Sequence, residues 1–167
     1  MLIRPETSAD RAAITTINQQ AFGRTSEAGL VNALRQVTSI ISLVAEFDNQ
    51  LVGHILFSPV QYDQAPTSIT IWGLGPLAVL PNQQAKGVGS ALVKAGLEAC
   101  RQAHIQALVV LGGPAYYQRF GFQPATNWHL RCHYPVDAQF FMAQELVEHA
   151  LAGLDGSISY HSAFDAV

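Results

Sequence analysis

The stretch from residue 77 to residue 92 reads Leu77-Ala78-Val79-Leu80-Pro81-Asn82-Gln83-Gln84-Ala85-Lys86-Gly87-Val88-Gly89-Ser90-Ala91-Leu92. Its apolar start predicts a strand, and the glycine-containing turn leads directly into a helix. Free N–H groups and the positive end of the dipole at a helix start favour an anion, and glycine lets the backbone approach a phosphate closely. The segment therefore predicts a pyrophosphate site, although the same glycines would also suit a tight strand-to-helix connection.

Spacing separates the phosphate-binding families that could use this turn. A P-loop requires G-x-x-x-x-G-K-[ST], whereas here Lys86 precedes the glycine pair. A dinucleotide fingerprint requires a third glycine where Leu92 stands, and it follows an N-terminal strand rather than a hairpin in the middle of the chain. The first family is excluded and the second fits poorly.

The turn from Gln84 to Gly89 resembles the Q/R-x-x-G-x-G/A turn by which the GNAT superfamily of N-acetyltransferases holds the pyrophosphate of acetyl-CoA. The predicted order of elements is similar to that of the superfamily over roughly residues 2–124. Within the superfamily, residues 74–79 and 110–122 look like the YhbS-like subgroup of predicted acetyltransferases, for which we know no established acceptor.

The resemblance implies both the reaction and its contacts. It implies transfer of an acetyl group from acetyl-CoA to an unidentified primary amine, by direct attack in a ternary complex. A splayed strand leaves backbone N–H groups free for the acetyl carbonyl and the pantetheine amides, and the resemblance marks Leu77 and Val79 for this role. The positions it assigns to acetyl-CoA are Leu77, Ala78, Val79, Gln84, Ala85, Lys86, Gly87, Val88, Gly89 and Ser90.

Tyr117 is the candidate catalytic residue, because Tyr117-x-x-x-Gly121-Phe122 is similar to the superfamily's Y-x-x-x-G-F element. The tyrosine of that element lies beside the CoA sulfur and is commonly assigned as the general acid. With ordinary pKa values, proton transfer from a tyrosine to a thiolate is uphill by roughly 2 kcal/mol, so a strong hydrogen bond would suffice. The alternative is that Tyr116 and Tyr117 only pack a helix on the sheet.

An acceptor amine is cationic at neutral pH and must lose a proton before it attacks. We expect Glu46 to be the general base, because it ends the first hairpin strand, near where superfamily members often carry an acidic residue. Glu27 and His54 are alternatives. A carboxylate at a strand end is most often only solvated.

Periodicity and turn residues predict the elements around the turn. Ser8 or Asp10 is expected to cap the first helix, and a polar stretch at 61–66 follows the hairpin. Residues 139–151 would also suit a helix. The predicted strands cover 2–4, 40–47, 51–57, 69–79 and 107–111, with further strands within 140–146 and around 157–160, and the predicted helices cover 8–22, 26–34, 88–99 and 114–120.

The fold class is therefore α/β (α+β), the GNAT fold: a mixed, mostly antiparallel sheet with a splayed central strand pair and flanking helices. We expect one acetyltransferase domain, 1–167, with a core at 2–124 and a less defined part at 125–167. Acceptor specificity is expected in this last part. Its large side chains would wall a pocket or pack the core, and they are Trp128, Tyr134, Phe140, Phe141 and Met142.

Composition limits the partners and the compartment. A formal charge of −3 gives no basic field for nucleic acid or an anionic membrane, and the 13% of charged residues leaves room for a homodimer interface. The acceptor is expected to be a small molecule or a peptide. Two cysteines without a C-x-x-C pair, no signal-peptide pattern and no bilayer-length apolar run predict a cytoplasmic protein.

Two further possibilities concern metal binding and function. His129, Cys132 and His133 form a cluster of ligand types, but no spaced pair completes a zinc set, so we expect no metal. The rival function is a non-catalytic acyl-CoA-binding sensor or interaction module that keeps the phosphate turn. The presence of Tyr117 favours the enzyme.

Overall fold

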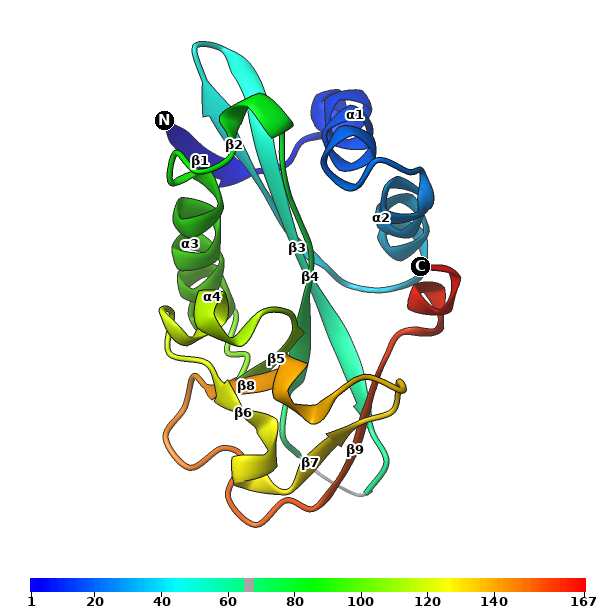
Figure 1. The fold of residues 1–167 in the computed structure, drawn as a ribbon, viewed down its shortest axis with the longest axis vertical. Helices are drawn as coiled ribbons and strands as arrows, with labels where there is room; N and C mark the ends of the chain where they lie inside the picture. The colour runs from blue at the N-terminus through cyan, green and yellow to red at the C-terminus, as the bar shows by residue number, and fades with distance from the viewer. Residues whose placement is uncertain (65–67) are drawn as a thin grey trace.

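The computed structural model describes residues 1–64 and 68–167. Its sheet has the strand order β1-β2-β3-β4-β5-β8-β6, and β9 pairs with both β3 and β7 (Figure 1). The pairing is antiparallel except between β4 and β5 and between β7 and β9. The strands are β1 Leu2–Pro5, β2 Ile41–Phe47, β3 Gln50–Tyr62, β4 Ile71–Val79, β5 Ala107–Leu111, β6 Gln123–Pro124, β7 Leu130–Cys132, β8 Phe141–Glu145 and β9 Gly156–Tyr160.

Helices cover both faces of the strands β2, β3 and β4. Helices α1 and α2 lie on one face, and α3 lies on the other (Figure 1). Successive side chains of β2 point to opposite faces of the sheet and so contact both layers of helices. Val44 packs with α1 and α2, whereas Leu43 and Ala45 pack with α3. The helices are α1 Arg11–Phe22, α2 Ser26–Val37, α3 Val88–Gln102 and α4 Pro114–Gln118, with short 3-10 turns η1 Ser8–Asp10, η2 Pro81–Gln83, η3 Ala125–Trp128, η4 Ala138–Phe140 and η5 Ser162–Ala166.

The predicted hairpin is confirmed and is longer than expected. Asp48 and Asn49 have φ values of 50° and 61°, the left-handed conformation that tight hairpin turns require. Strand β3 continues to Tyr62, so the polar stretch predicted at 61–66 begins inside a strand. The part of that stretch at 65 and 66 lies outside the described residues.

The predicted first helix begins in part as expected. Asp10 occupies the N-cap position of α1, as one of the two expected residues, but its side chain makes no cap hydrogen bond there. Ser8 lies inside the 3-10 turn η1, which starts after Thr7. The Asp10 carboxylate accepts hydrogen bonds from the Thr7 backbone at 2.7 Å and from the Thr7 hydroxyl at 3.2 Å. The acidic side chain therefore reaches back to the N-terminal end of the turn.

The central strands diverge as the sequence predicted. Parallel pairing of β4 with β5 runs from Ile71 opposite Ala107 to Leu74 opposite Val110. Strand β4 continues to Val79 on its β3 side, with one extra residue between Leu74 and Leu77 relative to β3. Beyond Leu74, the described part of β5 offers β4 no register partner, and the edge of β4 that faces away from β3 opens toward α4.

The C-terminal part completes the sheet. Strands β8 and β9 confirm the strands predicted near 140–146 and 157–160, and the helix considered for 139–151 does not form. Strand β8 pairs with β5 from Ala107 opposite Glu145 to Leu111 opposite Phe141. A second core, which includes Val109, Phe141 and Ile158, lies beneath this half.

Candidate active site

The turn before α3 has the backbone conformation of an anion site. Ala85 and Gly87 have φ values of 60° and 86°, and Gly87 is the residue that precedes α3. Successive N–H groups in such a turn converge on one point, and the amides of the first helical turn lack partners within the helix. The left-handed conformation at Ala85 is uncommon for a residue with a Cβ, so this position holds strain of the kind found at binding sites.

Tyr116 and Arg119 close one side of this turn. A Cβ at Gly89 would lie 2.7 Å from the Tyr116 hydroxyl, so only glycine fits there without displacing the ring. The Arg119 guanidinium donates to the Ser90 hydroxyl at 2.7 Å and lies 5.1 Å from the centre of the Tyr116 ring. A cation is therefore held beside the positive end of α3, where an anion would bind.

Strand β4 contributes main-chain groups to the same region. The Leu80 amide donates to the Val52 carbonyl of β3 at 2.9 Å, so by alternation the polar groups of Val79 and Leu77 point away from β3. The Gln84 side chain donates to the Val79 carbonyl at 3.1 Å and ties the turn to the strand. The predicted backbone role of Leu77 and Val79 is thus compatible with their orientation.

A cavity of about 550 Å³, here named the turn cavity, lies between the turn, β4 and α4. Three of the predicted positions are absent from its lining. Ala78 and Val88 are buried in the core, and the Lys86 side chain is exposed. The predicted residues that do line it are Leu77, Val79, Gln84, Ala85, Gly87, Gly89 and Ser90, joined by Ala21, Phe22, Tyr116 and Arg119.

Tyr117 lies in α4 with its ring packed at 5.0 Å from Tyr116 and 5.7 Å from Phe122, centre to centre. The residue is 9% exposed. Burial, with a smaller contribution from Tyr116, raises the pKa of Tyr117 to about 12. The hydroxyl is therefore protonated at neutral pH and acts as a hydrogen-bond donor.

A second cavity, of about 540 Å³, adjoins the first and is here named the aromatic cavity. Phe22 and Leu77 line both cavities. Tyr117 lines the aromatic cavity together with Tyr134, Tyr160 and Phe164. The two cavities thus meet at the opened edge of β4.

Glu27 lines the aromatic cavity from the first turn of α2. Its side chain is 7% exposed and pairs with Arg24, the shortest N–O distance being 2.6 Å. Glu27 carries no motif, and its place in the cavity depends on how α2 packs against β4 and the C-terminal part, so from the sequence it was only an alternative base.

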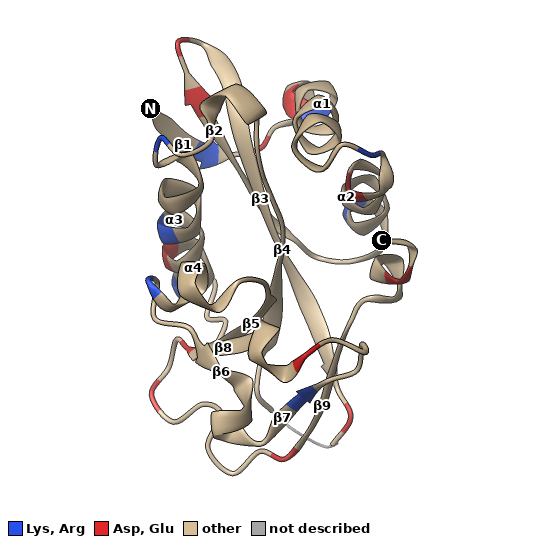
Figure 2. Cartoon of the chain, in the orientation of Figure 1, with Lys and Arg blue, Asp and Glu red and all other residues tan. Residues whose placement is uncertain are grey.

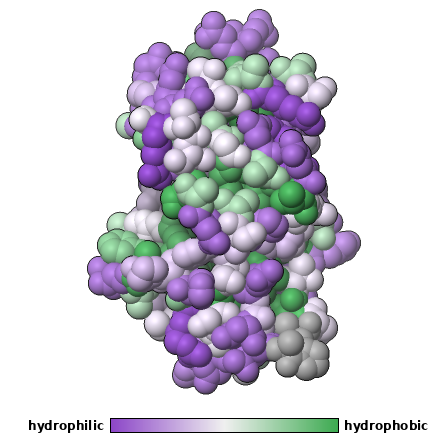
Figure 3. Space-filling view, turned by 90° about the vertical axis from the view of Figure 1, so that its right-hand side faces the viewer, coloured by the Kyte–Doolittle hydropathy of each residue, from purple (hydrophilic) through white to green (hydrophobic). Residues whose placement is uncertain are grey.

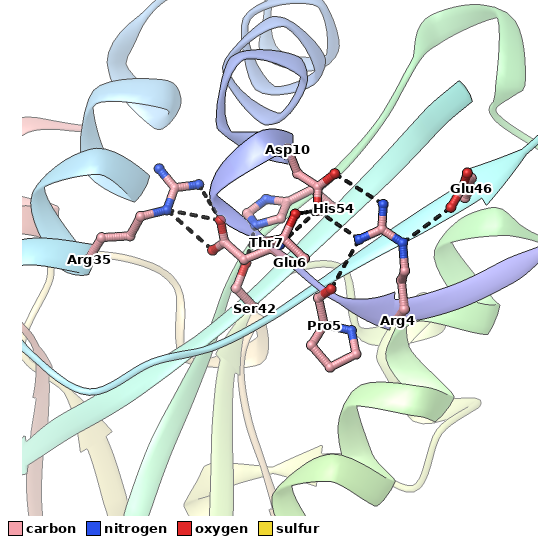
Figure 4. A network of polar contacts seen from close by, with 9 residues as sticks. All are labelled: Arg4, Pro5, Glu6, Thr7, Asp10, Arg35, Ser42, Glu46 and His54. Carbon is pink, nitrogen blue, oxygen red and sulfur yellow. Dashed lines mark hydrogen bonds and ion pairs between the residues drawn. The ribbon is translucent and has the colours of Figure 1, made fainter. Parts of the chain in front are cut away.

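Glu46 does not lie with Tyr117. Its carboxylate accepts from Arg4 Nε at 3.2 Å, and Arg4 also donates to Asp10 at 2.7 Å (Figure 4). Glu46 is absent from the described lining of both cavities. The structure therefore gives it a partner on β1 instead of a place beside the other predicted site residues.

His54 is also removed from the cavities, since it is fully buried beneath α1. Its Nδ1 lies 3.2 Å from Asn18 Nδ2, which can only donate, so Nδ1 is the acceptor. Its Nε2 therefore carries the proton toward the Ser42 hydroxyl, 2.8 Å away (Figure 4). Burial lowers the pKa of His54 to about 4, and because the side chain is fully buried, it cannot contact an acceptor in either cavity.

The large side chains of the C-terminal part divide between core and cavity. Tyr134 lines the aromatic cavity, whereas Phe141 and Met142 are buried in the sheet core. Trp128 packs on the second core, and Phe140 is exposed. The cavity residues that the sequence did not reveal include Phe22, Tyr160 and Phe164, which carry no motif and meet only through tertiary packing.

Charges of both signs are scattered over the helices and loops (Figure 2). Among the described residues, no group of three His, Cys, Asp or Glu side chains could hold a metal ion. No helix formed by these residues has the length and apolar character needed to cross a membrane.

Comparison with known protein families finds one matching family description, "Acetyltransferase (GNAT) domain", over residues 39–124. The match contains β2, β3, β4, the turn, α3, β5 and α4. It therefore includes Tyr117 and the described lining of the turn cavity except Ala21 and Phe22 of α1.

Known proteins resemble the chain over nearly its whole length. It is 36% identical over 167 residues, 99% of each chain, to a protein of Escherichia coli K12 named "Uncharacterized N-acetyltransferase YhbS". The crystal structure of E. coli YhbS in complex with CoA superposes with a TM-score of 0.91 at 35% identity, covering 98% of this chain and 91% of that one. The crystal structure of a Brucella melitensis GNAT family acetyltransferase in complex with acetyl-CoA superposes with a TM-score of 0.81 at 35% identity. The superposition covers 98% of this chain and 97% of that one.

Proposed function

The chain belongs to the GNAT acetyltransferase family, and from this premise we propose that it transfers the acetyl group of acetyl-CoA to a primary amine by direct attack in a ternary complex. The observation that carries the proposal is the meeting of the two cavities at Leu77 and Phe22, with Tyr117 lining the second. One cavity has the features of a donor site, and the other is open to an acceptor.

The residues of the turn cavity fit the donor. The amides of the α3 start, the left-handed turn at Ala85 and Gly87, and the Arg119 guanidinium supply positive charge for a pyrophosphate. The outward-facing polar groups of Leu77 and Val79 suit the amides of a pantetheine arm. The absence of a Cβ at Gly89 keeps the approach beside Tyr116 open.

Acetyl-CoA supplies a thioester whose carbonyl carbon is attacked by the neutral amine. The C–N bond forms, the C–S bond breaks, the nitrogen loses one proton to solvent, and the sulfur leaves as a thiolate that takes up a proton from solvent. With its pKa raised to about 12, Tyr117 holds its proton and donates a hydrogen bond to the sulfur as negative charge develops there. Full transfer of that proton to a thiolate of ordinary pKa would be uphill by about 5 kcal/mol. Tyr117 is therefore proposed to stabilise the leaving sulfur mainly by hydrogen bonding.

The compartment proposed for this reaction is the cytoplasm. Cys100 and Cys132 are both free thiols, and Cys100 is buried. Free thiols suit a reducing compartment, which is also where acetyl-CoA is used.

The test is a calorimetric titration of the purified protein with acetyl-CoA and with dephospho-CoA, followed by a thiol-release assay over a panel of amines. Saturable binding in the micromolar range and thiol release with at least one amine are expected. Binding without release across the panel would contradict the transferase proposal, and failure to bind would contradict the donor site.

A further inference from the structure

The aromatic cavity combines a single carboxylate with an apolar wall. Among the described residues that line it, Glu27 has the one formally charged side chain, and the others are aromatic, aliphatic, glycine or proline. Its volume of about 540 Å³ lies in the range of small-molecule sites. Figure 3 shows hydrophobic residues gathered across the middle of the face that carries α2 and the C-terminal turn η5.

Glu27 retains capacity to bind a cation. Arg24 donates to Oε2 through both Nε and Nη2, at 3.0 and 2.6 Å. In the described part of the chain, Oε1 receives one donor, Arg24 Nε at 2.8 Å. A carboxylate oxygen has two lone pairs, so Oε1 can accept a further hydrogen bond from the cavity side. Arg24 itself is 57% exposed and is the solvent-facing member of the pair.

Aromatic rings that pack against one another form another part of the lining. Tyr134 and Tyr160 pack edge to face at 6.3 Å, and Tyr160 and Phe164 do so at 4.8 Å. These rings suit an apolar group and can contact one cation through their faces. Asp165 accepts from the Tyr134 hydroxyl at 3.4 Å but is absent from the described lining. A second ammonium placed against the ring faces would therefore lose its water without meeting a carboxylate side chain of the lining, which is costly.

From this arrangement, and resting on the proposed acetyl transfer, we infer that the acceptor is a small monoamine whose ammonium is bound by Glu27 and whose body is aromatic or branched aliphatic. Glu27 acts as a binding residue. The ordinary pKa values of a carboxylate and an alkylamine differ by about 6 units, so the ammonium proton leaves to solvent before the neutral nitrogen attacks.

The first test compares apolar monoamines with polycationic amines in the thiol-release assay at saturating acetyl-CoA. 2-Phenylethylamine and isoamylamine are expected to give kcat/KM values about 100-fold above those of spermidine and kanamycin, because the latter bring uncompensated charges into the cavity. Release with the polycations but not with the apolar monoamines would overturn this inference and leave acetyl transfer standing. No release with any amine, from protein that binds acetyl-CoA, would overturn the transfer and the inference with it.

The second test separates amine binding by Glu27 from its ion pair with Arg24. Glu27→Gln should raise the KM for 2-phenylethylamine by about tenfold or more and leave the KM for acetyl-CoA unchanged. Arg24→Gln should lower the amine KM or leave it unchanged, because it frees the carboxylate. Glu98→Gln is the matched control, since Glu98 is exposed on α3 and pairs loosely with Arg101 at 3.9 Å.

Two results would overturn the role of Glu27. An equal rise in amine KM for Glu27→Gln and Arg24→Gln would show that the ion pair only stabilises the shape of the cavity and that Glu27 does not bind the amine. If Glu27→Gln does not fold, as judged by lost acetyl-CoA binding, Arg24→Gln decides alone, and a rise in its amine KM would overturn the inference.

Discussion

At the scale of single residues, the protonation of Tyr117 sets the pH dependence of the reaction. Its raised pKa of about 12 means that the hydroxyl keeps its proton throughout the range in which an alkylamine loses one. The rate at saturating acetyl-CoA should therefore rise with pH as the amine becomes neutral, without a falling limb from tyrosine ionisation up to about pH 10.

Tyr117→Phe tests the same residue directly. It should lower kcat by about 100-fold, because it removes the donor to the sulfur, and leave the affinity for acetyl-CoA unchanged. Stopped assays of thiol release from pH 7 to 10.5 compare the two proteins, with Tyr116→Phe as the neighbouring control. A falling limb near pH 10 in the natural chain that disappears in Tyr117→Phe would contradict the assigned pKa, and an unchanged kcat would remove Tyr117 from catalysis.

Arg119 is a donor-binding residue that the sequence motif does not include. Its contact with Ser90 places the guanidinium beside the α3 start, so we expect it to bind the pyrophosphate. Arg119→Ala should raise the Kd for CoA and for dephospho-CoA by the same factor, about tenfold, in calorimetry. Arg101→Ala, near the other end of α3, should change neither value. If the affinity falls for CoA but not for dephospho-CoA, which lacks the 3′-phosphate, Arg119 would instead bind that phosphate.

The role of a residue could not be predicted from the sequence where it depends on a partner that is distant in the chain. Glu46 has the position of a base at a strand end, but its partner Arg4 comes from β1, which pairs with β2 across 42 positions of sequence. Glu27 was a mere alternative, and the structure places it in the wall of the aromatic cavity. The burial of His54 could not be predicted either, because it results from the packing of α1 over this part of β3.

At the scale of elements, the N-terminal end of α3 is the feature that most strongly determines donor binding. Gly87→Glu would add a side chain and a negative charge where an anion is expected, in a backbone conformation with φ of 86° that glycine favours. We expect the Kd for acetyl-CoA to rise by at least about 100-fold in calorimetry, with unchanged helix content by circular dichroism. Lys94→Glu, on the exposed side of α3 and outside the turn, is the control and should have a much smaller effect. Equal affinity of Gly87→Glu and the natural chain would contradict the site.

The elements themselves were largely predictable, for local reasons. The hairpin, α3 and β5 have clear periodicity and turn residues, and the structure reproduces β5 at 107–111. The extra residue of β4 near Gly75 and Pro76 was visible because these residues interrupt a strand. The pairing of β9 with β3, which brings Tyr160 and Phe164 to the aromatic cavity, leaves no local signal, so the acceptor side could only be assigned to a region.

At the scale of the whole molecule, a buried polar chain joins β2 and β3 to helices α1 and α2. Asn18 donates to His54. Figure 4 shows that His54 lies against Ser42 and that Arg35 donates to Glu6, at 2.8 Å. Burial opposes the ionisation of Glu6, but hydrogen bonds from Arg35 and Ser42 outweigh it and lower its pKa. The network holds one neutral imidazole and one paired carboxylate inside the fold.

This network predicts how stability depends on pH. The folded pKa of His54, about 4, lies below the ordinary value of 6.5, so the unfolded chain takes up the proton first on acidification. The free energy of unfolding should be highest above pH 6.5 and should fall by up to about 3 kcal/mol as the pH drops toward 4. The carboxylates with lowered pKa values lose their contributions at lower pH, so the range from 6.5 to 5 isolates His54.

Urea unfolding at several pH values measures this dependence. His54→Gln, which keeps a donor and an acceptor, should remove most of the slope between pH 6.5 and 5. His133→Gln is the control, because His133 is exposed and should keep the slope. The same slope in His54→Gln as in the natural chain would contradict the assignment.

The divergence of β4 from β5 after Leu74 has a consequence for how such an enzyme changes over time. The groups that it exposes at Leu77 and Val79 belong to the main chain, which almost any side chain supplies equally, proline excepted. Substitutions can therefore accumulate in the part of the aromatic cavity that excludes Tyr117 and the two residues shared with the turn cavity, without altering donor binding. A gene copy could acquire a new acceptor by repacking only that part, while inheriting its acetyl source intact.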